Sequence, residues 1–399
     1  MQRTERNAYI ALNMVPGTGA VSVRGMVEAF GSLVAAWDAG PTDWMRIPGV
    51  GPRVAESIRS AFHAADVETE LARAADTGTV LVTLADAAYP KLLKTIHSPP
   101  LVLYVRGCVE ALDTVCVAMV GTRAPTQYGR EVARRFGFQL AQAGVTVVSG
   151  LARGIDTESH QAALRAKGRT IAVIGSALDE IYPPENRGLA ETIAASGGAV
   201  ISEYPFGRRP DRQTFPMRNR IVSGLSRAVL VVEAGVTSGT LITARHAADQ
   251  GRSVLAVPGR IDNPEALGCH RLLKQGARLA ECLDDVLEEM QTLRGFGSVS
   301  GQSVPAASRQ MSLGLGGNGE GAPVPQAPAP SPAPAALPAD PMESALLEAL
   351  REAGGETDVE TLLARTGLPA HKVSAKLISL EMKRRVRQLP GRRVALRKD

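Results

Sequence analysis

The chain has 399 residues, too many for one ordinary hydrophobic core, so its length predicts two to four domains. Hydrophobic residues make up 44% and charged residues 21%, as in globular proteins, and no apolar run is long enough to span a membrane. The net charge of +5 is uneven: residues 371–399 carry +8, which indicates either a polyanion partner or a solvated tail.

The sequence predicts a cytoplasmic protein without a bound metal. The N-terminal stretch MQRTERNAYIALNMV is too polar for a signal peptide and has no A-x-A cleavage site. The cysteines show no C-x-x-C spacing, which is typical of reduced cytosolic thiols. No group of His, Cys or Asp has the spacing of a metal site. The four cysteines are Cys108, Cys116, Cys269 and Cys282.

Residues 1–65 have a helical pattern with two Pro-Gly turns. The stretch I-P-G-V-G-P-R-V-A-E-S-I at residues 47–58 resembles a helix-hairpin-helix, with Gly49 and Gly51 in the turn. The backbone amides of such a hairpin can hold a nucleic-acid phosphate without reading sequence. Residues 15–19 are a weaker copy. A helical packing or protein-interaction module explains the same pattern, and few cations surround the turn.

Residues 66–294 alternate short apolar runs with helical patterns. Apolar β-branched strands separated by helices indicate a parallel sheet covered on both faces. We therefore expect an α/β fold, an extended Rossmann-like doubly wound sheet. The predicted strands are residues 115–120, 145–148, 170–174, 199–202, 228–232 and 253–257, with extra strands at 79–84 and 101–105 along the leading edge.

In such a sheet, ligands bind beyond the carboxyl ends of the strands. The loops expected there read V-G-T-R (120–123), S-G-L-A-R-G-I-D (149–156), I-G-S-A-L-D (174–179) and E-A-G-V-T-S-G-T (233–240). Small residues with free amides leading into helices favour a phosphate, and Arg123 and Arg153 can add bidentate contacts. A tight turn explains any one glycine alone. Four such loops at one edge favour the phosphate site.

The segment SEYPFGRRPDRQTFPMRNR at residues 202–220 interleaves five arginines with Tyr204, Phe206 and Phe215. Elsewhere the chain is poor in aromatic residues, which make up 4% of the total. Guanidinium groups follow phosphates and rings stack on unpaired bases, so the pattern suits single-stranded nucleic acid. The alternative is a charged surface loop whose rings belong to the core.

Several common chemistries find no support. The sequence has no G-x-x-x-x-G-K-[ST], the motif of P-loop nucleotide hydrolases. The first strand-end loop lacks the G-x-G-x-x-G of dinucleotide-binding folds, and no acidic residue after the second strand is placed to bind a ribose hydroxyl. We therefore expect no nucleotide cofactor. Asp156 and His160 are four residues apart, and we interpret Asp156 as a helix cap. Ser149 and Ser238 have no local base. We therefore expect no catalytic residue.

Residues 295–340 are rich in Gly, Ser, Pro and Ala and are predicted to be a linker. Beyond it, residues 343–352, 358–366 and 369–382 are predicted helices, and 383–396 contain two strands around Pro390-Gly391. That order is typical of a winged helix, which can bind duplex DNA or single strands through phosphates. A regulatory or dimerising role remains open. The basic candidates are Lys372, Lys376, Arg384, Arg385 and Arg387.

Together these motifs resemble one family. V-G-T-R, S-G-L-A-R-G-I-D-T-x-x-H, T-I-A-V-I-G-x-x-L-D-x-x-Y-P-x-E-N, S-E-Y-P, F-P-x-R-N-R-I-V-S-G-L-S, V-V-E-A, S-G-T-L-I-T-A-x-x-A and A-V-P-G follow in that order. The combination closely resembles the bacterial DNA-processing protein A (DprA/Smf) family over residues 81–287. The predicted domains are a helix-hairpin-helix (SAM-like) domain at 1–65, a Rossmann-like core at 66–294, a linker at 295–340 and a winged helix at 341–399.

The resemblance implies a non-enzymatic protein that binds incoming or exposed single-stranded DNA, protects it and helps load RecA during natural transformation and recombination. It also implies a homodimer formed through the Rossmann domain. Thr122 stands where serine is more usual, and the segment before Phe215 uses arginine where lysine is common. The resemblance places DNA contacts at Arg123, Ser149, Gly150, Arg153, Gly154, Arg208, Arg209, Arg212, Phe215, Arg218, Asn219 and Arg220, and the strand-end loops add Gly121, Ser238, Gly239 and Thr240.

Two other functions remain open. The core also resembles phosphoribohydrolases with the motif P-G-G-x-G-T-x-x-E, but Thr243 stands where their acid/base glutamate would be. The chain could also serve mainly as an interaction scaffold, because residues 269–290 offer apolar helical faces. These faces carry Leu272, Leu273, Leu283, Val286 and Leu287, most of which we expect in the core.

Overall fold

The computed structural model describes residues 2–292, 341–353, 356–366, 373, 377, 380, 386–389 and 393–396. The chain divides into two compact units, Met1–Ser303 and Val304–Asp399. None of the helices in the described ranges combines the length and the apolar character that a membrane span needs.

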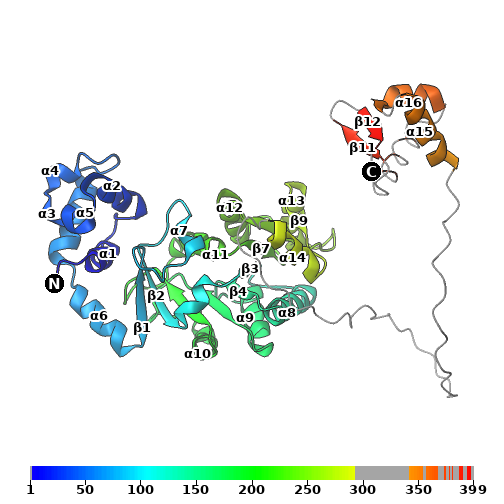
Figure 1. Cartoon of the computed structure of the whole chain (residues 1–399). Helices are drawn as coiled ribbons and strands as arrows, with labels where there is room; N and C mark the ends of the chain where they lie inside the picture. The colour runs from blue at the N-terminus through cyan, green and yellow to red at the C-terminus, as the bar shows by residue number, and fades with distance from the viewer. Residues whose placement is uncertain are drawn as a thin grey trace, which may run out of the picture. The chain divides into compact units, whose positions relative to one another are not determined.

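The first unit is built on one sheet, in the order β1-β2-β6-β5-β4-β3-β7-β8-β9 (Figure 1). Strands β3 to β9 are mutually parallel wherever they are neighbours, and β1 and β2 run antiparallel at one edge. The strands are β1 Thr79–Thr83, β2 Val102–Gly107, β3 Cys116–Val120, β4 Thr146–Ser149, β5 Thr170–Val173, β6 Ala199–Ser202, β7 Ala228–Val231, β8 Ser253–Ala256 and β9 Arg278–Leu279.

Helices cover both faces of this sheet, as the alternating pattern predicts. On one face lie α8 (Gln127–Gln142), α9 (Ile155–Arg165) and α10 (Arg187–Ala195). The other face carries α11 (Thr214–Gly224), α12 (Thr240–Asp249) and α13 (Leu267–Lys274) (Figure 1). Because both faces are covered, every residue of β3, β4, β5, β6 and β7 is buried. The prediction of a doubly wound α/β sheet is confirmed.

The sequence pattern places most strand ends within one residue. Strand β9 was not predicted, because its two residues are exposed and form no apolar run. The apolar positions of residues 269–290 mostly join the core: Val286 is fully buried, and Leu272, Leu273, Leu283 and Leu287 pack against core clusters.

Within the described residues, six helices precede the first strand of the sheet. Gly17 and Gly49 have φ angles of +89° and +84°, which favour glycine, and they form the two predicted turns. The helices contact the core directly: Asn13 Nδ2 donates to Glu203 O at 3.0 Å, and Phe206 N donates to the buried Glu70 at 2.9 Å. These contacts do not test the domain boundary predicted at residue 65, which stays a prediction. The helices are α1 Glu5–Asn13, α2 Ala20–Phe30, α3 Leu33–Asp38, α4 Pro41–Trp44, α5 Pro52–Ala64 and α6 Val67–Asp76.

In the second unit, α15 (Pro341–Glu352) and α16 (Val359–Thr366) flank the short strand β10 (Glu356–Asp358). Strands β11 (Val386–Leu389) and β12 (Arg393–Leu396) pair antiparallel, and β10 joins β12. Arg387 is exposed on β11. In the predicted third helix the described positions are 373, 377 and 380, all helical and buried. The linker at 295–340 and Lys372, Lys376, Arg384 and Arg385 lie outside the described residues.

Candidate nucleic-acid interface

The sheet has a topological switch point at β3. From β3 the chain moves to one side through β4, β5 and β6, and then crosses to β7 and β8 on the other side. Connections that diverge in this way leave a crevice beyond the carboxyl ends of the strands, where ligands of such sheets bind. A cavity of about 670 Å³ lies there, and we call it the switch-point pocket.

Ten predicted residues come together in this pocket. They come from four segments that are distant in sequence: the loop after β3, the loop after β4, α11 with the turn before it, and the loop leading into α12. The ten are Gly121, Arg123, Gly150, Arg212, Phe215, Arg218, Asn219, Ser238, Gly239 and Thr240. The pocket is also lined by Tyr182, Thr237 and Glu265, which the sequence did not predict as site residues. The Y-P-x-E-N motif was the available signal for Tyr182.

One wall of the pocket combines a cation with aromatic rings. The exposed guanidinium of Arg123 lies with its Cζ 5.5 Å from the ring centroid of Phe215. The ring of Tyr182 is 5.7 Å from that of Phe215 and tilted by 52°. Phe215 is half-buried and rests against Gly175, where an added Cβ would come within 3.1 Å of the ring. This wall offers a positive charge beside a π-face, as a base with its phosphate requires.

The pocket floor holds two buried charges. Arg218 is 4% exposed, and its Nη1 donates to Val173 O at 2.5 Å. Burial lowers the pKa of this guanidinium to about 10, although Asp156 acts in the opposite direction. Burial also raises the pKa of the Asp156 carboxyl, whose Oδ2 accepts hydrogen bonds from Gly150 N at 3.1 Å and Ala152 N at 3.3 Å. Asp156 therefore fixes the loop after β4, rather than acting with His160.

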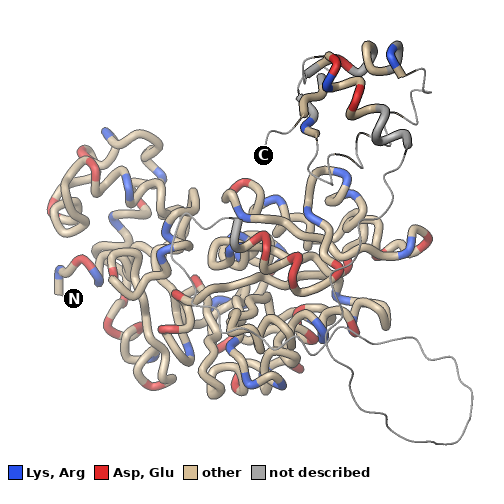
Figure 2. The backbone as a smooth tube through the Cα atoms, turned by 45° about the vertical axis from the view of Figure 1, so that its right-hand side comes forward, with Lys and Arg blue, Asp and Glu red and all other residues tan. Residues whose placement is uncertain are grey.

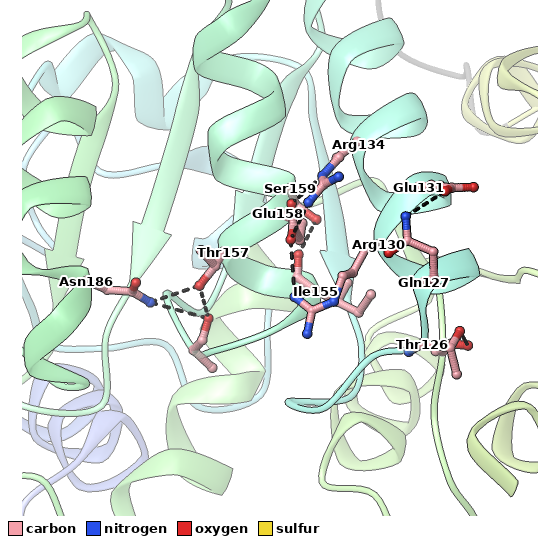
Figure 3. Close-up of polar contacts among 12 residues, drawn as sticks. Thr126, Gln127, Arg130, Glu131, Arg134, Ile155, Thr157, Glu158, Ser159 and Asn186 are labelled. Atoms are coloured by element: carbon pink, nitrogen blue, oxygen red, sulfur yellow. Dashed lines mark hydrogen bonds and ion pairs between the residues drawn. The ribbon is translucent and has the colours of Figure 1, made fainter.

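The same loop is held from outside the pocket (Figure 3). Asn186 Nδ2 donates to Leu151 O at 2.8 Å and to Thr157 Oγ1 at 2.9 Å, and Thr157 Oγ1 donates to Ala152 O at 2.7 Å. Behind the loop, Arg134 of α8 binds the carboxylate of Glu158 of α9 with bonds of 2.7 and 3.0 Å. These contacts fix the backbone conformation of the loop where it borders the pocket.

Other predicted residues lie outside the switch-point pocket. Ser149 is fully buried and donates to Met119 O at 2.6 Å, and Gly154 begins α9 with a φ of +76°. Arg153 pairs with Glu185 at the rim and borders a small cavity of about 20 Å³ next to Arg123. Arg208 pairs with Asp211 at 2.5 Å, and Arg209 is exposed.

Arg220 occupies a structural position. Its guanidinium binds both carboxylate oxygens of Glu203 at 2.8 and 2.6 Å and donates from Nε to Ser98 O at 3.0 Å. The side chain is 15% exposed, which leaves little of it for a ligand. This arginine ties α11 to the loop after β6 and so positions the neighbouring pocket residues.

His160 predicts a pH dependence of stability. It is fully buried, its Nδ1 lies 2.7 Å from Thr170 Oγ1, and burial lowers its pKa to about 3. In the unfolded chain, His160 binds a proton below pH about 6.5, whereas in the folded chain it stays neutral down to pH about 3. The free energy of unfolding is therefore unaffected by this group above pH about 6.5 and falls as the pH drops below that value. We expect a loss of about 1.4 kcal/mol per pH unit from this group between pH 6 and 4. Urea unfolding of His160→Gln should show a shallower acid slope, and an unchanged slope would contradict the assignment.

The comparisons with known proteins agree with this architecture. A family model described as DNA recombination-mediator protein A matches residues 80–291, and one described as DprA winged helix domain matches residues 328–392. Protein Smf of Synechocystis sp. is 37% identical over 403 residues, which cover 98% of this chain and 99% of that protein. The DNA processing protein DprA of Bacillus subtilis is 38% identical over 65% of this chain and 89% of its own length.

A solved structure gives the same result. The X-ray structure of DNA processing protein A from Streptococcus pneumoniae matches with a TM-score of 0.63 and 34% identity. The match covers 71% of this chain and 97% of that one.

Proposed function

The chain belongs to the DNA recombination-mediator protein A family, as its motifs predict, and we propose that it binds single-stranded DNA in the switch-point pocket. It is thus a DNA-processing protein of that family. The observation that carries the proposal is the meeting of Arg123, Phe215 and Arg218 with the loop amides in one cavity of about 670 Å³.

This arrangement favours a single strand over a duplex. In a duplex the bases stay stacked on one another, whereas a single strand can place a base against Phe215 and its phosphate beside Arg123. The loops contribute backbone amides at Gly121 and Gly239, which can bind phosphates without reading sequence. We therefore expect little sequence preference and strong salt dependence.

Family membership supports a proposal for the wider role. We propose that the chain protects exposed or incoming single strands and helps load RecA on them, as a homodimer formed through the Rossmann domain. The terminal modules then act as accessories: the turn around Gly49 and Gly51 and the exposed Arg387 are candidates for contacts with DNA. We propose no catalytic step, since Thr243 lines the pocket where a hydrolase would need its glutamate.

Arg123→Ala tests the pocket. Loss of one charge-assisted contact should weaken single-strand binding by about tenfold for every sequence tried. The slope of log affinity against log salt should fall by about 0.7. Fluorescence anisotropy with labelled oligonucleotides measures both quantities. Arg169→Ala, an exposed arginine just before β5, serves as the matched control and should bind like the parent. Equal affinities for parent and Arg123→Ala would remove this pocket as the binding site.

A further inference from the structure

The stretch between β6 and α11, residues 203–213, supplies part of the switch-point pocket, and we call it the β6–α11 segment. It carries Arg212, which lines the pocket, and it leads directly into α11 with Phe215 and Arg218. The segment consists of bends and turns and contains neither helix nor strand. Its path is therefore set by the contacts that it makes with other elements.

Two residues of the N-terminal helices hold the beginning of this segment. Helices α1 and α6 lie beside β1 and β2, at the antiparallel edge of the sheet (Figure 1). In α6, the carboxylate of Glu70 accepts a hydrogen bond from Phe206 N at 2.9 Å. At the end of α1, Asn13 Nδ2 donates to Glu203 O at 3.0 Å. Both bonds go to backbone atoms, so they fix the path of the chain itself.

The bond from Phe206 to Glu70 is buried. The Glu70 side chain is 4% exposed, and the ring of Phe206 packs edge-on against that of Tyr104, with their centroids 5.5 Å apart. Burial raises the pKa of the Tyr104 hydroxyl, and the charge of Glu70 raises it further, as expected for a carboxylate close by. Without the carboxylate, the Phe206 amide would lack an acceptor where water does not replace it, which costs more than loss of an exposed bond.

The next residues pass this restraint on to α11. Gly207 N donates to both carboxylate oxygens of Asp179, at 3.1 and 3.0 Å, but Asp179 is exposed to water. Asp211 Oδ1 accepts from Gln213 N at 2.7 Å and from Thr214 N at 2.9 Å, where α11 begins. Backbone-directed bonds thus run from the N-terminal helices to the start of α11, and the buried one lies at Glu70.

We propose that Glu70 and Asn13 are positioning residues for the DNA site, an inference that rests on the proposed function. They hold the β6–α11 segment so that Arg212 lies at the pocket and α11 begins in the right place. Basic and acidic positions are interspersed along the N-terminal helices (Figure 2), so the net field of these helices on a bound strand is weak. Their effect on DNA binding therefore passes through the backbone bonds, beyond any contact that they make with DNA.

Two substitutions at one position separate the hydrogen bond from the charge. Glu70→Met keeps most of the side-chain volume but removes the acceptor, whereas Glu70→Gln keeps an oxygen that can accept from Phe206 N. Both remove a negative charge, which alone would strengthen binding to a polyanion. In the full chain, Glu70→Met should bind poly-dT about fivefold more weakly, with a salt slope lower by about 0.7, one phosphate contact. Glu70→Gln should recover most of the parental affinity. Fluorescence anisotropy measures both.

Glu5 supplies the matched control in the same helices. Its carboxylate accepts from Leu33 N at 2.9 Å and Val34 N at 3.1 Å, and so it holds α3 rather than the β6–α11 segment. Glu5→Ala should loosen the N-terminal helices and still bind poly-dT like the parent. Asn13→Ala, which removes the donor to Glu203 O, should weaken binding in the same direction as Glu70→Met. It carries the test if Glu70→Met does not fold.

A second measurement reports on the segment without DNA. Trypsin cleavage after the exposed Arg212, followed by mass spectrometry, measures how readily the β6–α11 segment opens. Cleavage at this position should be faster in Glu70→Met and in Asn13→Ala than in the parent. In Glu70→Gln and Glu5→Ala the rate should stay near that of the parent.

The outcomes separate this inference from the proposed function. If Arg123→Ala loses affinity while Glu70→Met keeps parental affinity, the pocket stands and the positioning proposal is overturned, whatever the cleavage rate. Equal losses in Glu70→Met and Glu70→Gln also overturn it, because the acceptor would then not matter. A similar loss in Glu5→Ala overturns it as well, since any loosening of these helices would have the same effect. If Arg123→Ala changes nothing, the proposed function itself fails, and the cleavage rates then show whether Glu70 holds the segment.

Discussion

Arg218→Met should lower the free energy of unfolding by about 3 kcal/mol. The substitution removes the hydrogen bond to Val173 O and the positive charge that faces the buried Asp156 carboxylate. A buried carboxylate without its cation is costly, and so is a buried carbonyl without a donor. Urea unfolding followed by circular dichroism measures the loss. Single-strand affinity should also fall, because Arg218 lines the switch-point pocket.

The double variant Arg218→Met with Asp156→Asn provides the control. Asparagine keeps an oxygen that can accept the bonds from Gly150 N and Ala152 N, but it carries no charge. The double variant should therefore recover part of the stability that Arg218→Met loses. Additive losses from the two single substitutions would show that the two charges do not interact, and the description of the pocket floor would be wrong.

Phe215→Ala should weaken single-strand binding by about 1 to 3 kcal/mol, the range found for loss of one base-stacking ring. The ring is half-buried, lines the pocket and lies under the Arg123 guanidinium, so its removal takes away the surface on which a base would stack. Phe215→Leu keeps most of the apolar volume but loses the π-face, and it should bind nearly as weakly. Titration with poly-dT at constant salt measures both variants.

Phe138 supplies the matched control. It is 36% exposed on α8, on the opposite face of the sheet from α11, and it does not line the pocket. Phe138→Ala should bind poly-dT like the parent. Parental affinity in Phe215→Leu would show that bulk rather than stacking matters at this position, and the preference for single strands would need another cause.

The sequence carried enough information to assemble the pocket in outline. Apolar β-branched runs alternate with helices, and this pattern fixes a parallel sheet whose loops meet at one edge. Gly121, Gly150 and Ser238 could therefore be placed together although they are far apart in the chain. The rings were harder to assign: Phe206 is buried against Tyr104, whereas Phe215 reaches the pocket, and a linear pattern of basic and aromatic residues does not distinguish these two outcomes.

The sequence does not predict which residues pair with one another in the folded chain. Arg218 and Arg220 are two residues apart in one helix, yet one forms the pocket floor and the other is tied to Glu203. Positions two apart on a helix face different directions, and their partners come from segments that only the fold brings close. The support that Asn186 gives to the loop after β4 depends in the same way on the path of the chain between β5 and α10.

The location of the DNA site is decided by one titration. The full chain and a chain ending at residue 303, the end of the first compact unit, are each titrated with a labelled single strand and its duplex at two salt concentrations. We expect the shorter chain to retain single-strand binding that is tighter than duplex binding and that weakens as salt rises. Equal affinity for the duplex, or loss of binding in the shorter chain, would instead place the DNA contacts outside the switch-point pocket.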